Sequence, residues 1–153
     1  MAQGDITIFQ DWVGVLGLAE MNLNTDTVKL GLIRSAANGG ADPANTDADP
    51  GWSASRTTDF SAAQVTPGGN YATGGPDITN TYSESAGVGT FDGADLSIAQ
   101  DASNPTNARW GILYDDTDAD KKAIAFVDLG SDFDMTTGAL NITWNASGIL
   151  TIS

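Results

Sequence analysis

The sequence predicts a mainly β fold, a single β-sandwich or β-barrel-like domain with one short N-terminal helix and long loops. Short apolar runs separated by clusters of turn-forming residues support this prediction. Glycine is abundant, at 18 of 153 residues, and charged residues make up only 17% of the chain. A chain of 153 residues has the size of one domain, so we expect one core over residues 1–153.

The first element that the pattern predicts is a helix within residues 9–21, where apolar residues recur at helical spacing. Gly14 and Gly17 each weaken such a helix by about 1 kcal/mol relative to alanine, so we expect it to be short. Residues 1–8 precede it as a short, uncapped segment. We predict that this segment extends as an arm over a neighbouring subunit.

Alternation of apolar and other residues predicts the strands that follow. In Val28–Ile33 the alternation places Val28, Leu30 and Leu32 on one face and Lys29, Gly31 and Ile33 on the other. Further strands are predicted for residues 77–83, 88–91 and 95–99. Residues 108–116 and 122–130 are predicted to form a hairpin whose connection is "DTDADK".

The last stretch, "LNITWNASGILTIS", allows two interpretations. Asn141 and Asn145 each begin a motif typical of N-glycosylation acceptors. The alternation instead places Leu140, Ile142 and Trp144 on one face of a strand, and Asn-Ala-Ser-Gly is typical of a turn. We therefore predict two strands around a turn.

Residues 35–58 are the longest irregular stretch. A loop of this length in a compact domain is usually functional or mobile. Trp52 lies within it and either covers the core as a lid, the interpretation that we favour, or contacts a partner.

The composition disfavours several functions. Twenty acidic and six basic residues give a net charge of −14, which opposes binding to nucleic acid or to an anionic membrane. The chain has no cysteine and no histidine, so thiolate chemistry and imidazole bases are excluded. The only glutamates, Glu20 and Glu84, are not placed beside a chosen aspartate. We expect no enzymatic activity, no catalytic residue and no cofactor.

The N-terminal segment lacks both the positive charge of a signal peptide and the length of a membrane span. We therefore expect the protein to be made and retained in a cytosol.

Two acidic loops offer weak candidates for a divalent cation. Asp116, Asp118 and Asp120 have the spacing of the first ligands of a calcium loop, but Lys121 and Val127 stand where glycine and glutamate are required. A second loop, with Asn45, Asp47 and Asp49, has the same spacing and a proline at the glycine position. A solvated loop is the interpretation that we favour for both.

The order of several motifs is similar to that of a known family. After a short helix come "LNTDTVKLGLI", "GGNYATGG", "ARWGILYDD", "AIAFVDLG" and "ITWNASGILTIS". This order resembles a family of small virion proteins of tailed bacteriophages, apart from an expanded loop over residues 35–56.

The resemblance implies a structural role without catalytic residues. The expected role is that of a capsid decoration or cement protein, which binds the outer head surface and bridges major capsid subunits. The alternative is a minor tail or fibre-associated protein that acts in host attachment. The resemblance also implies a homo-oligomer, suspected to be a trimer, that is made in the bacterial cytoplasm and located on the virion.

An interface of this kind needs aromatic side chains at its centre. The candidates are the aromatic residues outside the alternating strands: Phe9, Trp12, Trp52, Phe60 and Tyr71.

Overall fold

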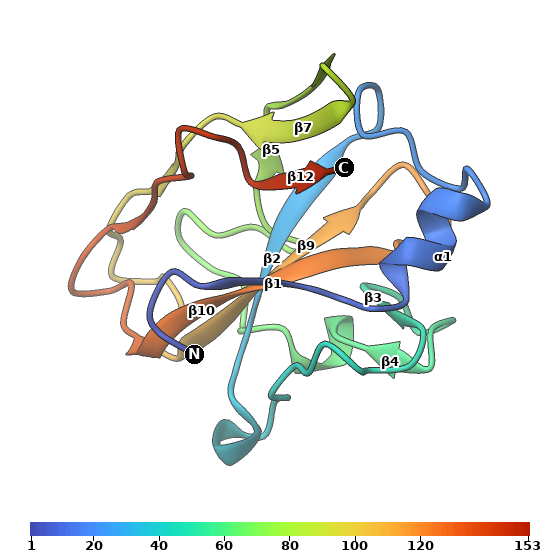
Figure 1. Ribbon diagram of the computed structural model, residues 1–153. Helices are drawn as coiled ribbons and strands as arrows, with labels where there is room; N and C mark the ends of the chain where they lie inside the picture. Colours follow the sequence, from blue (N-terminus) through green and yellow to red (C-terminus); the bar gives the residue numbers. More distant parts are fainter.

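A five-stranded antiparallel sheet forms the centre of the computed structural model, which describes residues 1–153 (Figure 1). Its strand order is β1-β10-β9-β2-β5. The strands are β1 (Ile6–Ile8), β2 (Val28–Ile33), β5 (Asp77–Ile78), β9 (Ala108–Asp115) and β10 (Ala123–Phe133). The predicted strand Val28–Ile33 and the predicted hairpin, now β9 and β10, are both confirmed.

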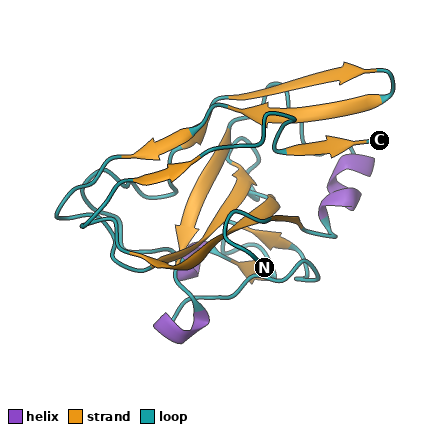
Figure 2. Cartoon of the chain, turned by 60° about the vertical axis from the view of Figure 1, so that its left-hand side comes forward, coloured by secondary structure: helices purple, strands orange, loops and turns teal.

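Two smaller antiparallel sheets lie over one face of the central sheet (Figure 2). One has the order β12-β7-β6 and the other the order β11-β8. Their strands are β6 (Asn80–Ser85), β7 (Val88–Gly93), β8 (Leu96–Ile98), β11 (Leu140–Ile142) and β12 (Leu150–Ile152). The prediction of a mainly β domain is confirmed, and because the central sheet ends at β1 and β5, the fold is not a closed barrel.

Irregular segments cover the opposite face of the central sheet. They contain a parallel pair of two-residue strands, β3 (Pro50–Gly51) and β4 (Thr58–Asp59). Two 3-10 turns, η1 (Ala36–Asn38) and η2 (Ser61–Ala63), flank this pair. The predicted long loop is therefore a packed layer with short regular elements of its own.

The central sheet is buried on both faces, and strand alternation divides its side chains between two clusters. Val28, Leu30 and Leu32 of β2 join the cluster beneath the smaller sheets. Ile33 joins the cluster beneath the irregular layer. This division agrees with the two faces predicted for Val28–Ile33.

The helix and the N-terminal segment both differ from the sequence-based prediction. The helix α1 spans only Trp12–Gly17, and Ala19 follows with a φ of 55° that ends it. The predicted arm is part of the domain, because Ile6–Ile8 pair with β10 as an edge strand. An arm over a neighbour is therefore wrong for these residues.

The C-terminal stretch contains the predicted turn. Asn145 accepts a hydrogen bond from the Ser147 N–H through its side-chain oxygen, at 2.9 Å, and Gly148 has a φ of 99°. The two strands that flank the turn do not pair with each other, because β11 pairs with β8 and β12 pairs with β7. Asn141 accepts a hydrogen bond of 2.7 Å from the Ser97 hydroxyl.

Candidate functional site

The five aromatic residues predicted to contact a partner all lie inside the protein. None of Phe9, Trp12, Trp52, Phe60 and Tyr71 is more than 5% exposed. Their burial corrects the expectation that these rings form the surface of an interface. The sequence held a signal for three of them, because burial was the interpretation favoured for Trp52 and because Phe9 and Trp12 lie among the apolar residues of the predicted helix. It held none for Phe60 and Tyr71, since a lone aromatic residue in an irregular segment has the same local sequence whether it is buried or exposed.

Trp52 covers the core, as in the interpretation favoured from the sequence. Its ring stacks on that of Tyr114 with the centroids 5.1 Å apart and the planes 5° from parallel. Phe9 packs between Phe60 and Phe126 at centroid distances of 5.6 and 5.2 Å. These contacts join the irregular layer to the central sheet.

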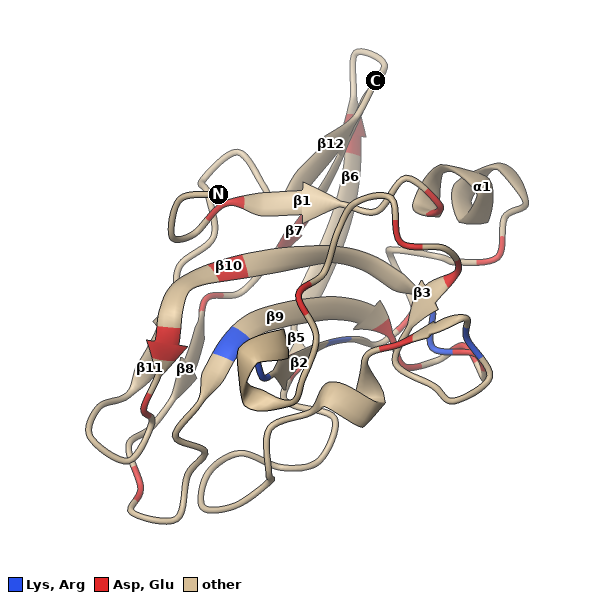
Figure 3. Ribbon diagram, turned by 90° about the horizontal axis from the view of Figure 1, so that it is seen from below, with Lys and Arg blue, Asp and Glu red and all other residues tan.

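Four of the six basic residues gather where β9 turns into β10, although they are scattered in the sequence (Figure 3). Asp116 is the centre of this group. It pairs with Lys29, at 2.9 Å, and with Lys121. Arg56 pairs with Asp49, and Lys122 pairs with Asp118.

The pKa values of these aspartates reflect the pairing. Burial opposes ionisation of Asp116, but hydrogen bonds from Lys121 and Lys29 outweigh it and lower the pKa of this carboxyl group. Burial also opposes ionisation of Asp118, whose pKa is lowered by the hydrogen bond from Lys122 and by the Asp120 N–H. Both groups are therefore held in the charged state by the lysines.

The same pairs occupy the carboxylates proposed as cation ligands. Asp120 accepts a hydrogen bond from the Ser55 hydroxyl at 3.1 Å and lies 4.0 Å from Arg56. In the second loop, Asp49 pairs with Arg56, and the Asp47 carboxylate accepts a hydrogen bond from the Ala44 N–H. No group of three or more acidic side chains in the structure is arranged to hold a metal ion.

Calcium is therefore expected to leave the melting temperature unchanged, and so is a chelator. The physical reason is that a cation at Asp116 would have to displace two ammonium groups that already neutralise it. Differential scanning calorimetry with calcium and then with chelator checks this prediction. A melting temperature that rises with calcium in the wild type, but not in an Asp116→Asn variant, would contradict it.

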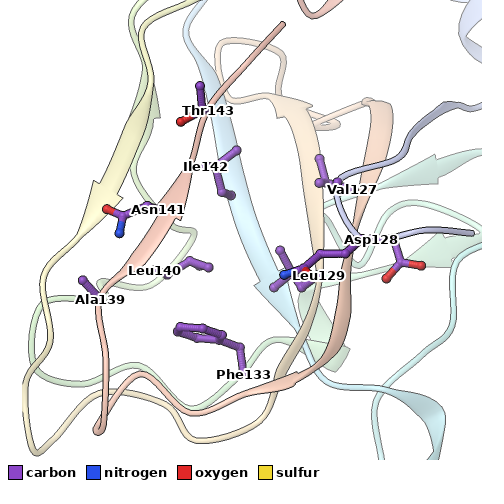
Figure 4. Close-up of a pocket in the computed structure, with 11 residues that line it drawn as sticks. Val127, Asp128, Leu129, Phe133, Ala139, Leu140, Asn141, Ile142 and Thr143 are labelled. Atoms are coloured by element: carbon purple, nitrogen blue, oxygen red, sulfur yellow. The ribbon is translucent and has the colours of Figure 1, made fainter.

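A hollow of about 260 Å³ lies between the start of the chain, β10 and β11. Figure 4 shows Leu140 and Ile142 on β11 and Val127 and Leu129 on β10 across from them. The single ionisable side chain in its lining, Asp128, is paired with Arg109. Six of its eleven lining residues are hydrophobic, and Gln3, Asn141 and Thr143 add uncharged polar groups.

Two more hollows lie on either side of α1. One, of about 310 Å³, is lined by charged residues and by Gly14 and Leu18. The other, of about 300 Å³, is mostly apolar and lies between the end of α1 and the smaller sheets, where Leu16, Tyr82 and Ile152 line it. Val13 on α1 and Leu18 directly after its last residue are exposed, at 70% and 72%.

This exposed face of α1 is the feature that sequence reasoning missed. A surface helix normally carries polar residues on its solvent side. The apolar residues at 13 and 18, together with Gly14 and Gly17, were the signal in the sequence that could have indicated it.

Comparisons with protein-family models, with curated proteins and with solved structures find no match for this chain. No helix of the structure is long and apolar enough to cross a membrane. The fold and its surface thus define a mainly β protein with a strongly acidic exterior and one exposed apolar helix face.

Proposed function

We propose that this chain is a non-enzymatic structural protein of a tailed bacteriophage, a capsid decoration or cement protein on the outer surface of the head. It bridges and stabilises major capsid subunits there. The proposal rests on the motif order that resembles small phage virion proteins and, among the structural observations, on the distribution of charge.

Five of the six basic residues are engaged by carboxylates of the same chain. The sixth, Arg34, donates to the Gly39 carbonyl oxygen at 3.4 Å. The surface therefore offers no free basic patch, and its net charge is −14. Packaged DNA would repel such a surface, whereas the outside of the shell carries no such penalty.

The mechanism of a cement protein is burial of surface across subunits. Each copy would contact two or more capsid subunits and add contacts that must break before the shell opens. Apolar burial contributes roughly 25 cal/mol per Å², so many copies together resist the pressure of packaged DNA. A trimer on a local threefold axis would contact several subunits at once.

The test is to mix the purified protein with shells of the same phage that lack it. Sedimentation and cryo-imaging then measure whether it binds the shell exterior in a fixed, symmetric ratio and raises the melting temperature of the shell. Binding of this kind is the expected result. Failure to bind shells, with density at the tail of intact virions, would replace the proposal with the tail or fibre-associated role.

A further inference from the structure

The two glycines of α1 have no structural reason to be glycine within this chain. A Cβ atom added at Gly14 or at Gly17 would meet no atom within 4 Å. Neither residue has a positive φ, so the backbone does not require glycine there. Since glycine weakens a helix, the chain gives up stability at both positions without a compensating contact of its own.

The residues beside these glycines form one exposed face. Positions three and four apart are neighbours on a helix, so Val13, Gly14, Gly17 and Leu18 lie together. The Leu18 N–H donates to the Gly14 carbonyl oxygen at 3.0 Å, which keeps Leu18 in register with the helix. Trp12 and Val15 point the other way, into the core. We call these four residues the α1 face.

Apolar exposure is unusual elsewhere on this protein. Only four large hydrophobic side chains are exposed: Met1, Val13, Leu18 and Val88. Two of them belong to the α1 face and are the most exposed of the four. An apolar patch that is kept in water typically marks a contact site.

The groove beside the α1 face carries an excess of negative charge. Four carboxylates line it, from Asp11, Glu20, Asp49 and Asp120, against the two cations Arg56 and Lys122. Arg56 pairs with Asp49 and lies 4.0 Å from Asp120, while Lys122 pairs with Asp118 and lies 3.7 Å from Glu20. Four carboxylates against two cations leave the groove with a net negative charge, and Asp11 is the one carboxylate of the four that forms no ion pair.

We propose that the α1 face docks a segment of another protein that carries an aliphatic side chain beside a lysine or arginine. The aliphatic group packs on the strip that Gly14 and Gly17 leave open, between Val13 and Leu18. The basic group reaches the carboxylates of the groove, among which Asp11 forms no ion pair within this chain. The identity of the partner rests on the proposed function: the segment belongs to the exposed surface of the major capsid subunit.

A second copy of this chain fits the α1 face poorly. A twofold contact presents the same patch on both sides, so the groove carboxylates would approach their own equivalents. Each chain also carries a net charge of −14. Charge complementarity therefore selects a basic partner.

The test compares Gly14→Ala and Gly17→Ala, singly and together, with Gly138→Ala as the matched control. An added Cβ at Gly138 also meets no atom within 4 Å, and Gly138 lies outside the helix. Each α1 substitution is expected to raise the melting temperature of the free protein by about 2–4 °C, because alanine favours the helix. The double variant is expected to bind shells at least about tenfold more weakly, a loss of about 1.4 kcal/mol. Gly138→Ala should bind shells like the wild type.

Charge gives a second readout. Wild-type binding to the shells should weaken as salt is added, and an Asp11→Asn, Glu20→Gln variant should show a flatter salt dependence. Equal salt dependence in the two proteins would overturn the assignment of a basic partner.

The outcomes separate this inference from the proposed function. If the wild type does not bind shells, both fail. If the wild type binds and the double glycine variant binds equally well, the docking role of the α1 face is overturned while the cement role stands. If the double variant instead lowers the sedimentation mass of the free protein, the occupant is a second copy and the proposal of a basic partner is overturned.

Discussion

Replacement of Trp52 by alanine is expected to lower the free energy of unfolding by about 3–5 kcal/mol, the range for removing a large aromatic side chain from a core. Trp52 is 5% exposed and stacks on Tyr114. It joins the irregular layer to β9 of the central sheet through this stacking. The Trp52 N–H donates to the Lys121 carbonyl oxygen at 2.8 Å, and this bond survives the substitution. Urea unfolding followed by circular dichroism measures the loss.

Gly31 provides a double-mutant cycle for the same contact. It lies on β2 beneath Trp52, and a Cβ atom at this position would overlap the six-membered ring of the indole. Gly31→Ala alone should therefore destabilise the protein by displacing the ring. In the Trp52→Ala background the new methyl group enters vacated space, so its cost should largely disappear. Additive effects of the two substitutions would show that Trp52 does not pack on Gly31 as described.

Replacement of Asp128 by alanine is expected to cost about 2–4 kcal/mol, because it leaves the cation of a mostly buried ion pair without its partner. Asp128 is 2% exposed and pairs with Arg109, whose side chain is 18% exposed. This residual exposure places the cost below that of a fully buried pair. The carboxylate also accepts a hydrogen bond of 2.6 Å from the Gly130 N–H. This bond lies where the pairing of β10 with β9 is irregular, between Asp128 and Phe133.

Lowering the pH should remove the stabilisation that the Asp128 carboxylate contributes. Burial opposes ionisation of Asp128, but the hydrogen bonds from Arg109 and from the Gly130 N–H outweigh it and lower its pKa. A group whose pKa is lower in the folded state stabilises the protein fully above its unfolded pKa, about 3.9 for aspartate. The stability difference between wild type and Asp128→Ala should therefore persist at neutral pH and shrink as the pH falls below about 4.

Arg109→Met and the double variant are the controls for this prediction. Arg109 also lies over the Trp110 ring, at 4.0 Å from the centroid, and methionine keeps part of that packing. If the pair acts as described, the double variant should lose less free energy of unfolding than the sum of the losses in the two single variants. A difference between wild type and Asp128→Ala that is independent of pH would contradict the assigned role of the charge.

Much of the fold could be predicted from the sequence because local patterns carry it. The alternation in Val28–Ile33 places Leu30 and Ile33 on opposite faces, and the structure shows them in different clusters. The turn at Asn145 follows from the chemistry of Asn and Gly, which the sequence displays directly. The acidic balance is a property of composition alone. The sequence by itself thus determined the mainly β class, the main strands, the turns and the net charge.

The partners of each element were decided only by the tertiary structure. The sequence does not record that β11 pairs with β8, or that Ile6–Ile8 join the central sheet. It likewise does not record that the Trp52 ring stacks on Tyr114, or that Lys29 forms an ion pair with Asp116. Each of these contacts joins segments far apart in the sequence, and its energy depends on burial and on distances that exist only after the chain has folded. For the same reason the structure places the aromatic residues predicted to face a partner in the core, and it shows that Val13 and Leu18, whose apolar character the sequence displays, are left exposed.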